Sequence, residues 1–154
     1  MNIFIRQATI KDVPTLLAIN LSSFNANATY DSHIDMNWVH TDHAKNHFVK
    51  AVSELGHYTI IAEVEDKVVG FLMLGPKHLV HRKVKMIELD ILAILPKFRS
   101  KGIGAKLMDH AKRWAREQGY ETMYASSYIK NDRAVDFYKK QGFATIDISL
   151  EMEL

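Results

Sequence analysis

The sequence predicts an α/β domain with a mixed sheet, because strand-like and helix-like hydrophobic patterns alternate along the chain. Two observations carry this prediction. The residues from Ile91 to Leu95 are apolar at every position, as expected for a central strand that is buried on both faces. A turn containing Gly102 and Gly104 then separates that strand from a long helical pattern. The chain of 154 residues has the length of one domain, so we expect residues 1–154 to fold together.

The elements of the first half follow from hydrophobic period and from capping residues. An aspartate followed by Pro14 is typical of a helix start, and Gly56 is typical of a helix end. Two apolar runs around the letters EDK predict a β-hairpin. The expected elements are, in order, a strand at residues 3–8, a helix from Asp12, a loop at 25–35, a second helix at about 37–55 and the hairpin at 58–75.

The second half predicts an alternation of strands and helices. The expected elements are a long strand at residues 83–95 ended by Pro96, a helix from the glycine turn to Gly119, a strand at 121–129, a short helix from Asn131 or Asp132 to Gly142, and a last strand at 144–154. That last strand is expected to be antiparallel. Its alternation places four apolar side chains on one face, namely Ile146, Ile148, Leu150 and Met152.

Composition excludes several classes of function. The chain has no cysteine, which excludes disulfides, zinc–thiolate sites and thiol nucleophiles. Its net charge of +2 does not indicate a nucleic-acid partner. No apolar stretch reaches the length of a transmembrane helix, and the first residues lack the apolar run of a signal peptide. We therefore expect a cytoplasmic protein with no membrane partner.

The glycine turn predicts an anion site. A helix N-terminus carries unpaired N–H groups and a partial positive charge, and Arg99, Lys101 and Lys106 add cationic side chains. The turn lacks the pattern of a nucleoside-triphosphate loop, and Leu107 stands where a dinucleotide fingerprint has its third glycine. A tight turn with an exposed basic rim is the alternative without a ligand.

Two motifs resemble those of the GNAT superfamily of N-acetyltransferases. The letters LPKFRSKGIGAKLM contain the pattern [RQ]-x-x-G-x-[GA] at Arg99, Gly102 and Gly104. The letters NDRAVDFYKKQGF, from Asn131 to Phe143, resemble the second motif, in which an asparagine precedes a helix with a tyrosine and a Gly-Phe pair. The resemblance implies a mostly antiparallel mixed sheet with a splayed parallel central pair and flanking helices.

The resemblance also implies acetyl-CoA as the donor and a primary amine as the acceptor. The pyrophosphate of coenzyme A is expected on the amides from Lys101 to Ala105, and the pantetheine arm beside Leu92, Ala93 and Ile94. An amide on that strand can act as an oxyanion donor to the thioester. The residues expected to contact the donor are Leu92, Ala93, Ile94, Arg99, Ser100, Lys101, Gly102, Ile103, Gly104, Ala105, Asn131, Ala134, Phe137 and Tyr138.

Three residues are candidates for the chemistry. Tyr138 matches the tyrosine of the second motif, and a phenol can donate a proton to the departing sulfur. Glu88 and Asp90 are carboxylates in a strand expected to be buried, and a spacing of two places both on one face, so each is a candidate base. Alternatively, Tyr138 is only a packed aromatic residue, and the two carboxylates pair with basic neighbours or lie at the solvated end of the strand.

The acceptor is not identified by the sequence. The resemblance implies a pocket built by the first two helices and their loop, with Phe24, Tyr30, Asp31, Asp35 and Trp38. His40, His43 and His47 fall on one predicted helix face, but the glutamate of H-E-x-x-H is missing, so we predict no metal.

Other readings stay open at this stage. A non-catalytic acyl-CoA-binding protein is the main alternative, and a nucleotide-dependent oxidoreductase is a weaker one. A homodimer is compatible with the resemblance.

Overall fold

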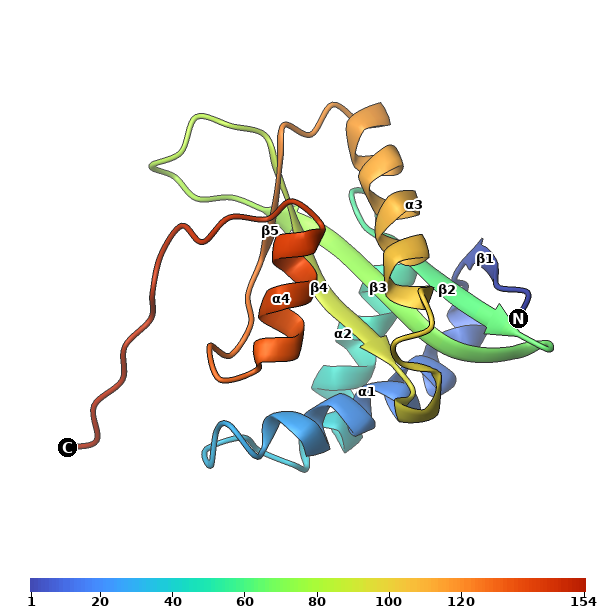
Figure 1. The fold of residues 1–154 in the computed structure, drawn as a ribbon, viewed down its shortest axis with the longest axis horizontal. Coiled ribbons are helices and arrows are strands. Elements are labelled where there is room, and N and C mark those ends of the chain that lie inside the picture. The colour runs from blue at the N-terminus through green and yellow to red at the C-terminus, as the bar shows by residue number, and fades with distance from the viewer.

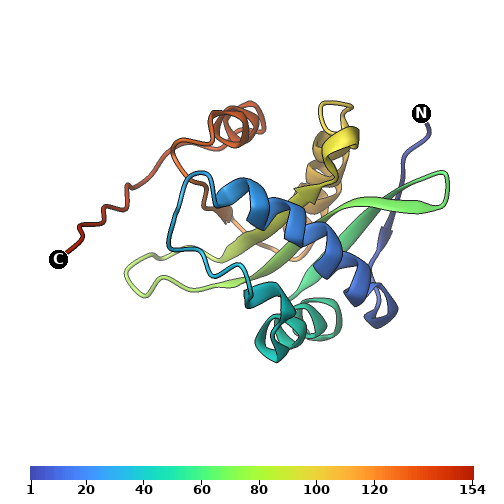
Figure 2. The same ribbon diagram turned by 90° about the horizontal axis from the view of Figure 1, so that it is seen from below.

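A computed structural model describes residues 1–154 and contains one five-stranded sheet with helices on both faces (Figures 1 and 2). The strands lie in chain order and only the last pair is parallel, which confirms the predicted mixed sheet. The strands are β1 (Phe4–Gln7), β2 (Tyr58–Val64), β3 (Lys67–Lys77), β4 (Met86–Ile94) and β5 (Thr122–Ala125). The helices are α1 (Val13–Asn27), α2 (Asp42–Ser53), α3 (Ile103–Glu117) and α4 (Asp132–Lys140), with short 3₁₀ turns at Ile10–Asp12, Trp38–His40 and Pro96–Phe98.

Each face of the sheet carries its own hydrophobic core. On the face covered by α1 and α2, Leu16 and Phe48 pack with Phe71 of β3. On the opposite face, Leu107 and Met108 of α3 pack with strand residues that include Leu72 and Ile87, and α4 adds partly buried aromatic residues. The sheet is therefore buried on both sides in its middle, as the apolar runs predict.

The predicted boundaries hold where a cap or a turn residue sets them. Asp12 precedes α1, Asn131 accepts a hydrogen bond from the Ala134 amide at the start of α4, and a left-handed Gly119 follows α3. Glu65 and Asp66 adopt positive φ in the tight turn between β2 and β3, which confirms the predicted hairpin. None of these helices combines the length and the hydropathy that crossing a membrane requires.

The second helix begins later than predicted. Thr41 has an extended backbone, and its side chain accepts a hydrogen bond from the Ala44 amide, so it caps α2 and separates that helix from the 3₁₀ turn. His40 consequently lies outside the helix that carries His43 and His47. A strand was also predicted as far as Ile129, but β5 ends at Ala125.

The apolar half of β4 is less buried than predicted. Of the residues from Ile91 to Leu95, only Ala93 is fully buried, and the others are half-buried. The reason is that β5 ends opposite the middle of β4 and leaves the rest of that strand without a parallel neighbour.

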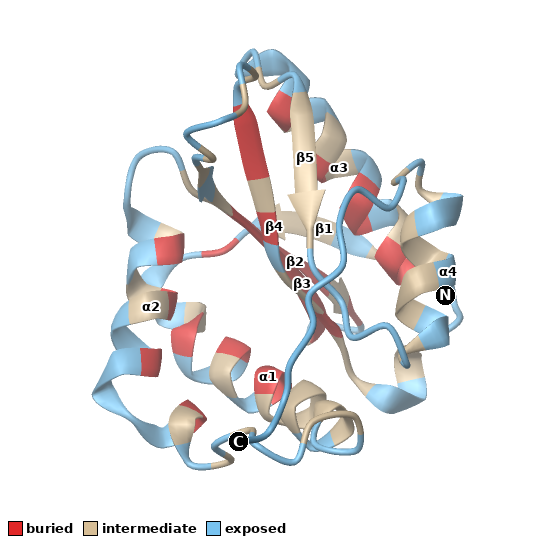
Figure 3. Cartoon of the chain, turned by 90° about the vertical axis from the view of Figure 1, so that its left-hand side faces the viewer, coloured by how far each residue is buried: buried red, intermediate tan, exposed pale blue.

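The predicted last strand is wrong. Residues 144–154 form no strand and pair with no other part of the sheet. Figures 1 and 3 show this segment leaving the end of α4 and running outward, exposed along its whole length. Side-chain alternation predicts that a segment can be a strand, but the pairing partner is a property of the tertiary structure.

The core under α2 generates a stability prediction. Phe48 is 0% exposed and its ring meets Phe71 edge to face, with centroids 6.0 Å apart. We expect Phe48→Ala to lower the free energy of unfolding by about 3–5 kcal/mol, because it removes buried apolar surface and leaves a cavity. Urea denaturation measures this change. Phe4→Ala is the matched control: Phe4 is 59% exposed, so its loss should cost far less. Equal losses for the two variants would contradict the assignment of the core.

Candidate active site

The parallel pair β4–β5 parts halfway along β4. Pairing with β5 ends at Leu89 and Ala125, whereas β4 continues to Ile94. On the other side of β4, the pairing with β3 skips Asp90. Met73 of β3 lies opposite Ile91, and the next residue of β3, Leu74, lies opposite Leu89. Asp90 is thus the extra residue of a β-bulge at the point where the strands part.

The exposed half of β4 directs backbone amides into this opening. The Leu95 amide donates to the carbonyl oxygen of Val69 on β3, at 2.9 Å. Because alternate residues of an antiparallel strand bond to the same neighbour, Ala93 also faces β3, and Leu92 and Ile94 face the side that β5 has left. Of the three strand residues predicted to bond the donor, the geometry leaves Leu92 and Ile94 with amides free to do so.

The glycine turn follows directly and begins α3. Gly102 has a φ of 79° at the N-cap position, and a Cβ there would meet nothing within 4 Å, so the turn is open on that side. Ser100 also has positive φ. Arg99 Nε donates to the Ile94 carbonyl oxygen at 2.8 Å and ties the turn to the end of β4. The first amides of α3, from Ile103 onward, therefore stand beside the opening without a side-chain cap.

Two guanidinium groups lie at this turn without an acidic partner. Arg133 Nη2 donates to the Ser100 hydroxyl at 3.1 Å, and neither Arg99 nor Arg133 forms a salt bridge. Burial and the nearby charge of Arg133 both lower the pKa of Arg99. Unpaired cations at a helix N-terminus favour an anionic ligand. Sequence analysis missed Arg133, although its place in the first turn of the second motif was a usable signal.

Gly104 has a packing role in addition to the expected one. A Cβ at this position would lie 3.3 Å from Ile94 Cδ1 and from two ring atoms of Phe137. Glycine is therefore needed for the close approach of α3 to β4 and α4. Of the two glycines, only Gly102 faces open space.

The second motif packs α4 beside the same opening. Asn131 caps α4 by accepting from the Ala134 amide at 3.2 Å, so its side chain is partly engaged. Phe137 and Tyr138 join the cluster that contains Leu92 and Ile94. Burial raises the pKa of Tyr138 to about 12, and its hydroxyl has no hydrogen-bond partner in the protein. The phenol therefore keeps its proton at neutral pH and is free to donate it to a ligand.

The two candidate carboxylates face the opposite side of the opening, toward α2. Glu88 and Asp90 line one pocket of about 120 Å³, together with His47 and His57. His47 Nε2 lies 2.6 Å from Asp90 Oδ2, and Lys77 Nζ lies 3.2 Å from Glu88 Oε1. Each carboxylate thus has the basic neighbour that the alternative interpretation expected.

His47 is the functional side chain that sequence analysis did not select. The hydrogen bond to Asp90 raises the pKa of His47, while burial and Lys50 oppose this shift. The ring also packs edge to face on Trp38, with centroids 6.3 Å apart. Its helical spacing from His43 was noted as a metal pattern, but only the fold brings it to Asp90, which is 43 residues away.

The loop between α1 and α2 closes one end of the opening. The Tyr128 hydroxyl, beyond the end of β5, donates to Asp31 Oδ2 at 2.7 Å, and the rings of Tyr30 and Tyr128 lie 6.1 Å apart. The Asp31 carboxylate raises the pKa of Tyr128 to about 12, and this hydrogen bond lowers the pKa of Asp31. Phe24 stacks on Trp38 at 5.4 Å.

Asp35, also expected in the acceptor pocket, has a different role. Its carboxylate accepts from the Asn37 amide at 2.9 Å and so holds the turn before the 3₁₀ segment. The loop between α1 and α2 therefore offers Asp31, rather than both aspartates, as an acid at the opening.

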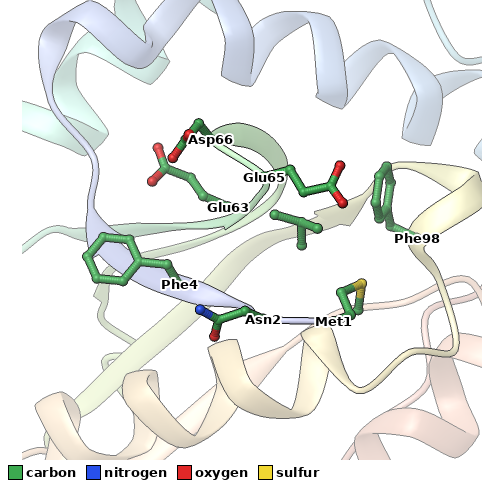
Figure 4. Close-up of a pocket in the computed structure, with 8 residues that line it drawn as sticks. Met1, Asn2, Phe4, Glu63, Glu65, Asp66 and Phe98 are labelled. Atoms are coloured by element: carbon green, nitrogen blue, oxygen red, sulfur yellow. The ribbon is translucent and has the colours of Figure 1, made fainter.

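Another pocket lies elsewhere in the molecule. It has a volume of about 550 Å³ and is lined by residues around the β2–β3 turn, including Glu63, Glu65 and Asp66, with Phe98 at its edge (Figure 4). Three carboxylates make it unsuited to a diphosphate, and it contains no residue predicted to contact the donor. The candidate site is the opening where β4 and β5 part instead.

Comparisons with known proteins agree with this geometry. Residues 20–143 match the Acetyltransferase (GNAT) family. The chain is 28% identical over 145 residues to the uncharacterized N-acetyltransferase YjgM of Escherichia coli (strain K12), covering 94% of this chain and 84% of that protein. It is 31% identical over 101 residues to N-alpha-acetyltransferase 50 of Danio rerio, covering 65% of this chain and only 59% of that protein.

Solved structures show the same fold at low identity. A mutant of the BH1408 protein from Bacillus halodurans superposes with a TM-score of 0.87 at 19% identity, covering 98% of this chain and 99% of that chain. AAC(6')-Iy, solved with the bisubstrate analogue CoA-S-monomethyl-acetylneamine, has a TM-score of 0.76 at 15% identity, covering 100% of this chain and 99% of that chain. With four fifths of its length matched and this fold in place, the chain belongs to the acetyltransferase (GNAT) family.

Proposed function

We propose that this acetyltransferase transfers an acetyl group from acetyl-CoA to a primary amine of a small molecule or peptide, by direct attack in a ternary complex. The parting of β4 and β5 is the observation that carries the proposal. It leaves an apolar strand half exposed, with free amides, directly before a helix N-terminus that has two unpaired guanidinium groups. A thioester on an apolar arm that ends in a diphosphate has the matching chemistry.

The donor site follows from the charges and the open backbone. The diphosphate binds the first amides of α3, with Arg99 and Arg133 beside it. The pantetheine amides bond to the backbone of Leu92 and Ile94, and the apolar side chains there become buried in the complex. Asn131 and Phe137 line the side formed by α4.

The transfer then needs a proton acceptor and a proton donor. The amine nitrogen forms a bond to the acetyl carbon, the C–S bond breaks, the amine loses a proton and the thiolate gains one. A strand amide stabilises the oxyanion of the tetrahedral intermediate. Tyr138 donates to the departing sulfur, because its phenol is protonated at neutral pH and its hydroxyl has no hydrogen-bond partner within the protein.

The His47–Asp90 pair is the base that the geometry favours. It lies at the bulge, on the α2 side of the opening, where an amine can approach a thioester held on the α4 side. When His47 is neutral, the pair can accept one proton from the attacking amine, directly or through a water molecule. Glu88 is the second candidate, although Lys77 holds its carboxylate.

A cationic acceptor suits the other end of the opening. Asp31 stays ionised because the Tyr128 hydrogen bond lowers its pKa, and Tyr30 and Tyr128 offer aromatic faces for cation–π contact. One relative is named an N-alpha-acetyltransferase, and one solved structure with the same fold is named an aminoglycoside acetyltransferase. A cytoplasmic location is part of the same proposal.

The alternative function is acyl-CoA binding without transfer. The observation that favours it is that both candidate bases are engaged by basic side chains. Incubation with acetyl-CoA and a panel of amines separates the two functions: release of free thiol that depends on an amine supports the transferase, and tight coenzyme A binding without release on any amine supports the binder.

The donor site generates the first prediction. Arg133→Gln should weaken coenzyme A binding about threefold to tenfold by calorimetry, because one unpaired cation is removed from the diphosphate. Lys45→Gln is the control. Lys45 is an exposed residue of α2 away from the opening, so this variant removes the same charge and should leave the affinity for coenzyme A unchanged. Equal affinities for the two variants would contradict the placement of the diphosphate.

The phenol generates the second prediction. Tyr138→Phe should lower kcat about 10²-fold or more and leave the affinity for coenzyme A nearly unchanged, because only the proton donor is lost. Phe143→Leu is a control that alters packing beside the same ring without touching the hydroxyl. An unaltered kcat in Tyr138→Phe would mean that the thiolate departs without this acid.

The base generates a pH prediction. Since the pair with Asp90 raises the pKa of His47, the charged pair persists above pH 6.5 and is lost as the pH rises through the raised value. We expect kcat/KM to rise with pH through that value. Asp90→Asn should move the midpoint to lower pH and reduce the plateau, whereas Asp109→Asn, at an exposed position of α3 away from the pair, should do neither. A profile unchanged by Asp90→Asn but abolished by Glu88→Gln would assign the base to Glu88.

A further inference from the structure

The side chain of Lys77 lies across the sheet at the edge of the opening. Lys77 is the last residue of β3. Its Nζ lies 3.2 Å from Glu88 Oε1 on β4 and 4.6 Å from the centroid of the Tyr124 ring on β5. The only other lysine that pairs with a carboxylate, Lys50, is held by Glu54 four residues along the chain. Lys77 is therefore the one lysine whose acidic partner is a candidate base.

The strand register places this ammonium group next to the parting of β4 and β5. Glu88 lies opposite Tyr124 in the parallel pair, and the next pair, Leu89 with Ala125, is the last before the strands separate. A strand rises about 3.3 Å per residue. The Nζ that contacts Glu88 and Tyr124 is thus held about one or two residues from the opening.

The amine is also on the side where an acceptor is proposed to enter. Glu88 lines the same pocket as Asp90 and His47, on the face of the sheet that α2 covers. A carboxylate and the face of an aromatic ring are the groups that bind a primary ammonium ion. Lys77 therefore occupies, with its own ammonium group, an environment suited to the amine of an acceptor.

Lys77 is held there only in part. Its side chain is 26% exposed, and of its three donors one makes a hydrogen bond, to Glu88. The ammonium group stands at the end of a flexible four-carbon stem. A rotation of that stem can move Nζ from Glu88 toward the opening without any change in the backbone.

We propose that Lys77 is an internal acceptor: when acetyl-CoA is bound and no external amine is present, the chain transfers the acetyl group to Nζ of its own Lys77. The inference rests on the proposed function and adds a modification site to it. Glu88 takes one proton from the ammonium group and passes it to solvent. Nζ then forms a bond to the acetyl carbon, the C–S bond breaks, and a second proton from the nitrogen leaves with the sulfur as free thiol. The products are acetylated Lys77 and coenzyme A.

The modification changes the opening. Acetylation removes the charge of Lys77 and so ends its ion pair with Glu88. The Glu88 carboxylate then becomes available to an external amine. The same pairing that makes Lys77 an acceptor thus keeps Glu88 occupied until Lys77 is modified.

Mass spectrometry of the purified full chain, after incubation with acetyl-CoA alone, tests the proposal. Peptide mapping is expected to find the acetyl group on Lys77 about tenfold or more ahead of Lys67 and Lys83. Those two lysines are exposed and have no carboxylate partner, so they report uncatalysed acetylation by the thioester. Because donor and acceptor meet within one chain, the rate at Lys77 should not depend on protein concentration.

Three variants give the matched comparison. Lys77→Arg keeps the charge but should abolish the rapid acetylation, whereas Lys67→Arg, at the other end of the same strand, should not. Glu88→Gln should slow the acetylation of Lys77 about tenfold or more and leave the slow reaction at Lys67 unchanged. Circular dichroism checks that all three are folded.

Equal acetylation of Lys77 and Lys67, a rate at Lys77 that rises with protein concentration, or an unchanged rate in Glu88→Gln would overturn the proposal. An amine panel applied to the same preparation tells this failure from a failure of the proposed function. Amine-dependent thiol release with Lys77 unmodified leaves the transferase standing and rules out the internal acceptor. Absence of both rules out both.

Discussion

Backbone pairing between β4 and β5 ends at Leu89 and Ala125, and the rest of the candidate site depends on that interruption. An unbroken parallel pair would place every amide of β4 in the ladder and every apolar side chain of its second half in the core. The bulge at Asp90 shifts the face that each following residue presents. The opening is therefore an interruption of the one parallel pair in the sheet.

The residues on the two faces of the sheet have different proposed roles on either side of this opening. Arg99, Gly102 and the α4 residues lie on the side where a diphosphate and a thioester arm can bind. Asp90 and His47 lie on the α2 side, where an amine can enter. An acid with a raised pKa on one side and a basic pair on the other suits a reaction that moves one proton in and one proton out.

Family membership and the individual roles stand on different evidence. The match over residues 20–143 and the shared fold establish an acetyltransferase of the GNAT family. The roles of Tyr138, Asp90 and His47 are argued from contacts within this chain and are decided by the variants. The acceptor is described only by its chemistry, as an amine that suits Asp31 and the aromatic rings beside it.

The sequence by itself determined the order of elements, their caps and the two motifs, because hydrophobic period, capping and glycine conformation act over a few residues. It therefore located the turn at Gly102, the helix cap at Asn131 and the carboxylates on one face of β4. Only the tertiary structure decided where β5 ends, that His47 of α2 meets Asp90 of β4, and that residues 144–154 form no strand. Those facts depend on which distant segments meet, and a local pattern contains no information about its partner.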